Sequence, residues 1–271
     1  KKQSNKSKLK EKQLLKLKEL KSRAYYDKEA DELLKRKFYG EELYTLLSKG
    51  KQDHCSINFS VLSNLLSSTF KHAKRRENLF PIVDRQPDYS LRCVYSGDLL
   101  EDSNGGFVQK CDEEHSLPQS FQARSRMGCG RDLHQMFACS KHANGSRGNK
   151  PFGKSKLSTV DRDYDYGVFY VNQIGENRSD SVKSFIPKNN FSVVSRSSLY
   201  IITAYEGAVD QEKFPSEFLS CVIEEALKEN VSEWERHRNC EIYKLQGNRN
   251  PFIDFPWLCS VIDFTQGYKQ I

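Results

Sequence analysis

The chain has 271 residues, of which 37% are hydrophobic and 29% are charged, and its mean hydropathy is −0.73. This length allows one large domain or two small ones, each with a sizeable core. No run of about 18 apolar residues is present, which excludes a membrane-spanning helix, and the lysine-rich opening lacks the apolar segment of a secretory signal peptide.

The net charge of +7 is concentrated at the amino terminus. Residues 1–23 hold nine lysines and Arg23 against Glu11 and Glu19, a net +8, so the rest of the chain sums to −1. A cationic arm raises the encounter rate with polyanions and adds salt-sensitive affinity for them. Two interpretations remain open: an arm that contacts nucleic acid or an assembly partner, and a solvated helix that contacts nothing.

The first half of the chain is predicted to begin with helices. Residues 5–50 carry recurring leucines among lysines and glutamates with no Pro and no Gly before Gly40, and residues 59–74 place apolar side chains on one side of a second helix. Residues 89–95 and 107–110 are predicted to be short strands that form a hairpin across the 103–106 turn.

Further along the chain, residues 155–180 are polar and are predicted to form a loop. A helix is expected at 195–205, followed by a long helical region at 214–241 that is interrupted near Asn230. An aromatic, proline-punctuated stretch follows at 250–257. This mixture predicts an α+β protein with few short strands and many helices.

Eight cysteines are spread along the chain, and no two are closer than ten positions. The close C-x-x-C spacing of zinc sites is therefore missing. Four disulfides in an oxidising compartment, secreted or periplasmic, and eight thiols in an intracellular or organellar one both fit this count. The positions are Cys55, Cys93, Cys111, Cys129, Cys139, Cys221, Cys240 and Cys259.

Two short segments about thirty residues apart carry the residues suited to chemistry. The first, 114–121, places a carboxylate beside an imidazole at Glu114 and His115, and the second, 132–149, adds Asn144 and Arg147. A one-metal phosphodiesterase needs oxygen ligands for a hard cation and a base to activate water. These segments supply both.

The adjacency of Glu114 and His115 restricts where the two residues can lie in a strand. Neighbours on a strand point to opposite faces, so His115 must lie at a strand end if both are to serve one phosphate. Asn144 is then expected to start a helix that crosses the strands, and Gly145 and Gly148 let its backbone approach a phosphate closely.

Around these residues the chain resembles the endonuclease I family of ββα-metal (His-Me) finger nucleases. Three further stretches extend the resemblance, which covers about residues 38–260: Val94-Tyr95-Ser96-Gly97, then Phe185 and Pro187 followed by Ser195-Arg196-Ser197-Ser198-Leu199-Tyr200, and finally residues 246–254. It implies a ββα-metal core in a mostly helical single domain. The organisation expected is a basic helical arm at 1–37, a nuclease domain at 38–260 and a tail at 261–271.

The resemblance also implies roles for individual residues. His115 would be the general base, and Glu114 with Asn144 would hold one divalent cation, Mg²⁺ in the first place and Mn²⁺ or Ca²⁺ as alternatives. The expected activity is a largely sequence-nonspecific endonuclease that hydrolyses DNA, with RNA as a second substrate class, to 5′-phosphate products. No organic cofactor is expected. The default guess for the group that fixes the His115 tautomer is a backbone carbonyl.

The remaining site residues are predicted less specifically. Arg126 is preferred as the arginine that stabilises the transition state, with Arg124 and Arg131 as the other candidates. Arg124, Arg131, Arg147 and Asn149 are predicted to bind nucleic acid; for Arg147, contact with a phosphate and bracing of the loop remain equal alternatives. His134 is interpreted as a core histidine rather than a ligand.

The chain departs from the family pattern after His134. Gln135-Met136 replaces the usual His or Asn followed by Leu, and Ala138 replaces a proline; both changes are expected to affect packing more than chemistry. They motivate an alternative function, a catalytically silent, nuclease-derived binding or scaffold subunit of a larger assembly. A zinc-stabilised structural module is a third hypothesis, which the cysteine spacing does not favour.

Overall fold

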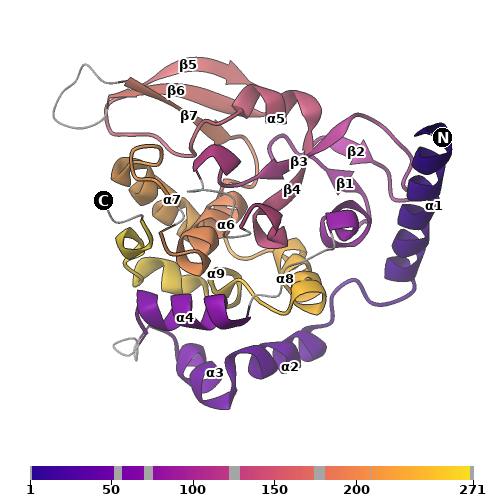
Figure 1. Ribbon diagram of the computed structural model, residues 1–271, viewed down its shortest axis with the longest axis horizontal. Helices are drawn as coiled ribbons and strands as arrows, with labels where there is room; N and C mark the ends of the chain where they lie inside the picture. The colour runs from indigo at the N-terminus through magenta and orange to yellow at the C-terminus, as the bar shows by residue number, and fades with distance from the viewer. Residues whose placement is uncertain are drawn as a thin grey trace.

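The computed structural model describes residues 2–51, 57–69, 76–121, 129–173, 181–207 and 209–268. Helices dominate these residues, and the strands form three small sheets (Figure 1). The predicted α+β class with few short strands is confirmed. Within these ranges, no helix is long and apolar enough to cross a membrane.

The elements follow one another as helices, then two hairpins, then a sheet and more helices (Figure 1). The helices are α1 (Lys2–Lys21), α2 (Lys28–Tyr39), α3 (Glu41–Ser48), α4 (Phe59–Thr69), α5 (Lys141–Arg147), α6 (Phe191–Ala204), α7 (Ser216–Lys228), α8 (Glu233–Gln246) and α9 (Pro251–Asp254). The strands, all in antiparallel pairs, are β1 (Leu91–Arg92) with β2 (Leu99–Glu101), β3 (Cys111–His115) with β4 (Met136–Ser140), and β5 (Ser158–Tyr164), β6 (Gly167–Gln173) and β7 (Ser181–Pro187) in one sheet.

The helical prediction for residues 5–50 is confirmed, as three helices. Asp27 starts α2 by accepting a hydrogen bond from the Ala30 backbone N–H at 3.0 Å. Gly40, at φ +75°, separates α2 from α3. The prediction for 59–74 is confirmed as α4 up to Thr69, and the remaining positions lie outside the described residues.

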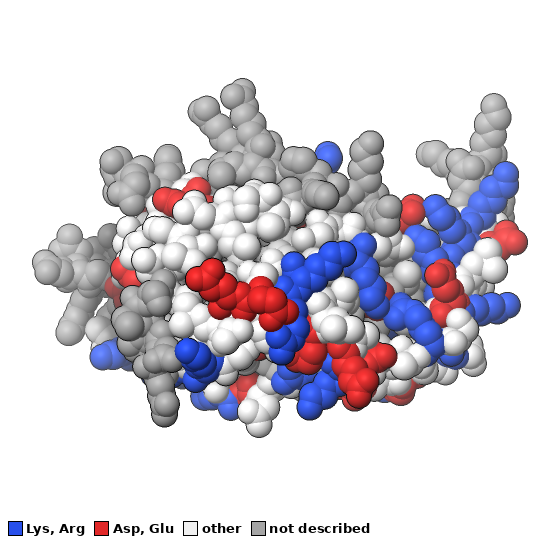
Figure 2. Space-filling model, turned by 90° about the horizontal axis from the view of Figure 1, so that it is seen from below, with Lys and Arg blue, Asp and Glu red and all other residues white. Residues whose placement is uncertain are grey.

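The basic helix α1 lies against the body of the protein. Leu17 and Leu20 are buried, and Lys12 and Lys16 pair with Glu77 at 3.1 and 3.2 Å. Seen from below, Lys and Arg side chains gather with some acidic ones at the end of the molecule where α1 lies (Figure 2). The boundary of a separate arm at residue 37 stays a prediction.

The first hairpin differs from the one predicted. The strand expected at 89–95 covers only Leu91–Arg92, and its partner is β2 rather than residues 107–110. Phe107 forms an isolated bridge with Glu101. The physical reason is the turn after β1, where the Cys93 N–H donates to the Asp98 carbonyl and the Gly97 N–H to the Cys93 carbonyl, each at 2.8 Å, so the chain reverses at once and β2 becomes the partner.

The loop predicted at 155–180 is wrong, because β5 and β6 occupy most of it; residues 174–180 lie outside the described ranges. Nearly every residue of β5 is exposed, so the strand lacks the alternation of buried and exposed side chains that reveals a strand in sequence. It is held by its backbone ladder to β6, and the buried contacts of the sheet come from β6 and β7, where Phe169 lies opposite Phe185.

The carboxy-terminal helices build the core. The helix predicted at 195–205 begins earlier, at Phe191, and every residue of α6 is buried. The region predicted at 214–241 is confirmed as α7 and α8 with a break around Asn230, because Ser232 and Glu235 cap α8 reciprocally. The apolar core gathers around α6, which contacts α4, α7 and α9.

The seven cysteines in the described part of the chain are free thiols, and Cys55 lies outside it. Cys93 and Cys139 come closest, with their sulfurs 3.6 Å apart in the core. Within the described residues, no disulfide joins these cysteines.

Candidate active site

The β3–β4 hairpin and α5 together form a ββα unit. Glu114 lies opposite Phe137 and His115 opposite Met136 in the antiparallel register. β3 ends at His115, as the sequence predicted. In Figure 1, α5 lies between this hairpin and the β5–β6–β7 sheet.

Glu114 is a buried carboxylate with two donors on one oxygen. The Tyr95 hydroxyl and the Arg147 guanidinium both donate to its Oε1, and only 3% of the residue is exposed. Burial raises the pKa of Glu114 above its usual value, and Arg147 opposes this rise without cancelling it. A second positive charge beside Glu114 would therefore stabilise its ionised form.

The half-buried His115 ring is oriented through its Nε2 atom. Nε2 lies 3.0 Å from the Gly130 carbonyl oxygen and 3.1 Å from the Gln119 side-chain amide. The Gly130 carbonyl oxygen can only accept and the Gln119 amide nitrogen can only donate, so a neutral Nε2 can hydrogen-bond one of them but not both. With the hydrogen on Nε2 and directed at the Gly130 carbonyl, the lone pair lies on Nδ1 and the Gln119 nitrogen is a neighbour of the ring rather than its hydrogen-bond partner. The orienting group is of the kind expected from the sequence, a backbone carbonyl.

Arg147 holds the two ends of the unit together. It is 1% exposed, and besides Glu114 it donates to the carbonyl oxygens of His115 at 2.7 Å, Ser116 at 2.9 Å and Lys150 at 2.8 Å. Its guanidinium also lies over the ring of Phe152, 4.3 Å from the centroid. Of the two alternatives for Arg147, these contacts match the bracing role.

Asn144 lies inside α5 rather than at its start, which corrects the prediction. Ser140 is the residue that caps the helix, because its hydroxyl accepts the Ala143 N–H at 3.2 Å. The Asn144 amide nitrogen donates to the Glu113 carbonyl at 3.3 Å, which directs the amide oxygen away from that strand. Gly148, at φ +53°, ends the helix.

The side chains here can contribute to a site for a hard cation but cannot complete one alone. Glu114 and Asn144 offer a carboxylate and an amide oxygen, the ligand types that Mg²⁺ prefers. In the described ranges, no group of three or more His, Cys, Asp or Glu side chains could hold a metal. Water and substrate would have to supply the other ligands, as they usually do for Mg²⁺.

The predicted arginines are only partly covered. Arg124 and Arg126 lie in 122–128, outside the described residues. Arg131 is exposed at the end of a short helical turn (Cys129–Arg131), beside the Gly130 that contacts His115. Asn149 is exposed just after α5.

The sequence interpretation missed the roles of Tyr95 and Gln119. Tyr95 belongs to a stretch noted for its resemblance, Val94-Tyr95-Ser96-Gly97, but only as a strand. Gln119 follows His115 by four residues in the segment first singled out. Both signals were present in the sequence, although neither reveals which atom is contacted.

A buried polar network positions the turn that leads into β4. Asp132 accepts hydrogen bonds from the Tyr200 hydroxyl at 2.7 Å, the Tyr205 hydroxyl at 2.9 Å and the Gln246 amide at 2.6 Å. His134 is buried beside it, as predicted for a core histidine, and burial lowers its pKa. Residue 246, in the predicted carboxy-terminal stretch, therefore supports the hairpin.

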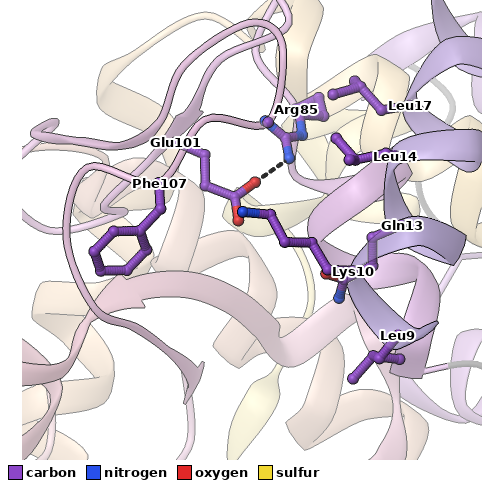
Figure 3. Close-up of a pocket in the computed structure, with 9 residues that line it drawn as sticks. Leu9, Lys10, Gln13, Leu14, Leu17, Arg85, Glu101 and Phe107 are labelled. Atoms are coloured by element: carbon purple, nitrogen blue, oxygen red, sulfur yellow. Dashed lines mark hydrogen bonds and ion pairs between the residues drawn. The ribbon is translucent and has the colours of Figure 1, made fainter. Parts of the chain in front are cut away.

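A cavity of about 260 Å³ lies outside this unit, between α1 and the β1–β2 hairpin. Figure 3 shows Lys10 extending across it toward Glu101, which pairs with Arg85, while Leu9 and Phe107 stand on either side. The cavity contains none of the site residues predicted from the sequence.

The chain matches one protein family and one known nuclease. Residues 39–257 match the endonuclease I family. The chain is also similar to an extracellular ribonuclease of Bacillus subtilis (strain 168), with 25% identity over 234 residues that cover 80% of this chain and 72% of that protein. The family predicted from the sequence is confirmed. The chain belongs to the endonuclease I family and is a nuclease that acts on phosphodiester bonds.

Proposed function

We propose that this nuclease is a metal-dependent, largely sequence-nonspecific endonuclease that cleaves DNA and RNA to 5′-phosphate products. The observation that carries the proposal is the pairing in one hairpin of a buried carboxylate, Glu114, with an imidazole whose Nε2 faces a backbone carbonyl. The similarity to an extracellular ribonuclease supports the inclusion of RNA.

In the proposed mechanism, His115 acts as the general base. Its Nδ1 takes a proton from the water that attacks the phosphorus, and its Nε2–H remains directed at the Gly130 carbonyl. Binding of this hydrogen to a fixed carbonyl prevents the ring from presenting the wrong nitrogen. Arg147 keeps the His115 backbone in place through its carbonyl oxygen.

Glu114 and Asn144 are proposed to hold one divalent cation, Mg²⁺ in the first place, with Mn²⁺ and Ca²⁺ as alternatives. When bound, the cation supplies positive charge near the phosphate and the departing oxygen. Tyr95 and Arg147 fix the Glu114 carboxylate so that its second oxygen can face that cation. Arg126, Arg124, Arg131 and Asn149 remain proposed contacts to the substrate.

The test is cleavage of supercoiled plasmid and of end-labelled RNA with Mg²⁺, Mn²⁺, Ca²⁺ or EDTA. We expect metal-dependent cleavage of both and ends that a ligase can rejoin, because such ends carry a 5′-phosphate. Cleavage that persists in EDTA, or products with 3′-phosphate ends, would contradict the mechanism. Binding without cleavage under every metal would favour the silent scaffold subunit.

A further inference from the structure

We propose that a second cavity, between α5 and the β5–β6–β7 sheet, is a subsite for an unpaired nucleotide of the substrate strand. Its volume is about 300 Å³. Cationic side chains would bind the phosphate of that nucleotide, and the base would stack on Tyr164. The inference rests on the proposed function, because the nucleotide belongs to the strand that the enzyme cleaves.

The sheet register brings the lining side chains to one face. Arg162 lies opposite Phe169, which lies opposite Phe185. Tyr164 and Lys183 are each two positions from members of this row, so they point the same way. The register shifts between Val160 and Arg162, and such a bulge redirects side chains locally.

The lining is cationic. Lys150, Arg162 and Lys183 face the cavity against one carboxylate, Asp161. Asp161 pairs with Lys183 at 3.2 Å, but the lysine is 55% exposed, so the pair is weak and can yield to a phosphate. Burial and the neighbouring cations lower the pKa of Lys150, and a bound anion would relieve this repulsion.

Tyr164 offers a flat platform for a base. Its ring stacks on that of Tyr166, with centroids 5.1 Å apart and an interplanar angle of 9°. Tyr166 is buried, whereas Tyr164 is 39% exposed. A supported, exposed ring beside cations is the arrangement that binds single strands without reading their sequence. Because a base in a duplex is already stacked on its neighbours, an unpaired base fits this platform best.

The cavity is connected to the candidate active site through Arg147. The Lys150 carbonyl accepts from the Nε of Arg147 at 2.8 Å, while the Nη1 of the same guanidinium contacts Glu114. Lys150 also donates to the carbonyls of Ser146 at 3.1 Å and Arg147 at 3.2 Å. The segment 146–150, which lines the cavity through Ser146 and Lys150, is therefore held to the candidate active site by Arg147.

The first experiment measures binding of a fluorescein-labelled oligothymidylate in EDTA by anisotropy, over a range of salt concentrations. The test variant is Arg162→Gln/Lys183→Gln. The control Lys51→Gln/Lys244→Gln removes the same charge from exposed positions outside the cavity. We expect the logarithmic salt slope of the test variant to fall by about 0.7, because both cations bind the single phosphate of the nucleotide in the cavity. A slope equal to that of the control would overturn the subsite.

The second experiment tests the stacking. Tyr164→Leu should weaken oligothymidylate binding by about 5- to 150-fold, the range for loss of one base–aromatic stack. Tyr164→Phe keeps the ring and should bind as the wild type does. Binding of a duplex of equal length should change less in Tyr164→Leu. Equal binding of the single strand by Tyr164→Leu and Tyr164→Phe would overturn the base platform.

Cleavage of plasmid and RNA by the wild type, measured in parallel, separates the two proposals. If the wild type cleaves with Mg²⁺ but the cavity variants bind as the control does, the subsite is wrong and the proposed function stands. If binding depends on the cavity but no metal supports cleavage, the proposed function fails and the cavity is a nucleic-acid site nonetheless.

Discussion

Two buried arginine–glutamate pairs serve different regions of this molecule. In the helical body, Arg196 meets both oxygens of Glu235, with Nε at 2.8 Å and Nη2 at 2.9 Å, and each side chain is 1% exposed. In the ββα unit, Arg147 and Glu114 are almost as buried. The two pairs therefore consist of the same residue types and are almost equally shielded from solvent.

The difference lies in how the donors are used. Arg196 places a bidentate fork on its carboxylate, the arrangement that best satisfies a buried charge. Arg147 directs donors to backbone carbonyls around His115 and shares one oxygen of Glu114 with Tyr95. The first pair therefore fixes helices, whereas the second fixes a carboxylate and the backbone that carries the His115 imidazole.

The largest expected effect on stability is in the helical pair. Arg196→Met should lower the free energy of unfolding by about 3–5 kcal/mol, because it leaves Glu235 buried without its cation. Urea denaturation measures this loss. Arg36→Met, which breaks the exposed pair with Glu41, is the control and should cost less than about 1 kcal/mol. Equal losses would refute the importance of burial.

In the second pair, the expected effect is on cleavage. Glu114→Gln should lower the cleavage rate by about 100-fold, equivalent to about 2.7 kcal/mol, through loss of charge on the cation ligand. The matched Glu235→Gln should leave the rate of the folded protein unchanged while lowering its stability. Single-turnover cleavage measures both. Similar rates for the two variants would remove the functional distinction between the pairs.

A smaller effect is expected from the tyrosine hydroxyls. Tyr95→Phe removes a hydrogen bond to Glu114, and Tyr39→Phe removes one of 2.9 Å to Asp254. Each should lower stability by about 1.5–3 kcal/mol, the usual contribution of a hydrogen bond to a charged group. Only Tyr95→Phe should also slow cleavage. A matching loss of activity in Tyr39→Phe would indicate a general effect of destabilisation.

The smallest effect is expected at the surface of α1. Lys12→Ala breaks its pair with Glu77, in which both side chains are largely exposed at 57% and 43%. Such pairs contribute less than about 1 kcal/mol and are screened by salt. Thermal unfolding at low and high salt should show nearly the same midpoint for variant and wild type. A large shift would mean that the arm stabilises the body through this pair.

The sequence contained much of the ββα unit. The adjacency of Glu114 and His115 predicted a strand end, and β3 ends there. The contacts of Glu114 could not be predicted, since Tyr95 and Arg147 reach it from 19 and 33 residues away. Long-range side-chain contacts leave no periodic pattern in one sequence.

At two places the local sequence pattern predicts a structure that differs from the one observed. The sequence predicts Asn144 at a helix start, but Ser140 caps α5 four residues earlier. β5 was missed because an exposed, polar edge strand has the composition of a loop. The start of α5 depends on a side-chain cap and β5 on its backbone ladder to β6, and neither produces hydrophobic periodicity in the sequence.

The most direct measurement compares cleavage by the wild type and by His115→Ala with saturating Mg²⁺, with folding of both checked by circular dichroism. Loss of a general base predicts a rate lower by on the order of 10²- to 10⁴-fold in a folded variant. If folded His115→Ala cleaves as fast as the wild type, His115 is not the base and the proposed mechanism is wrong.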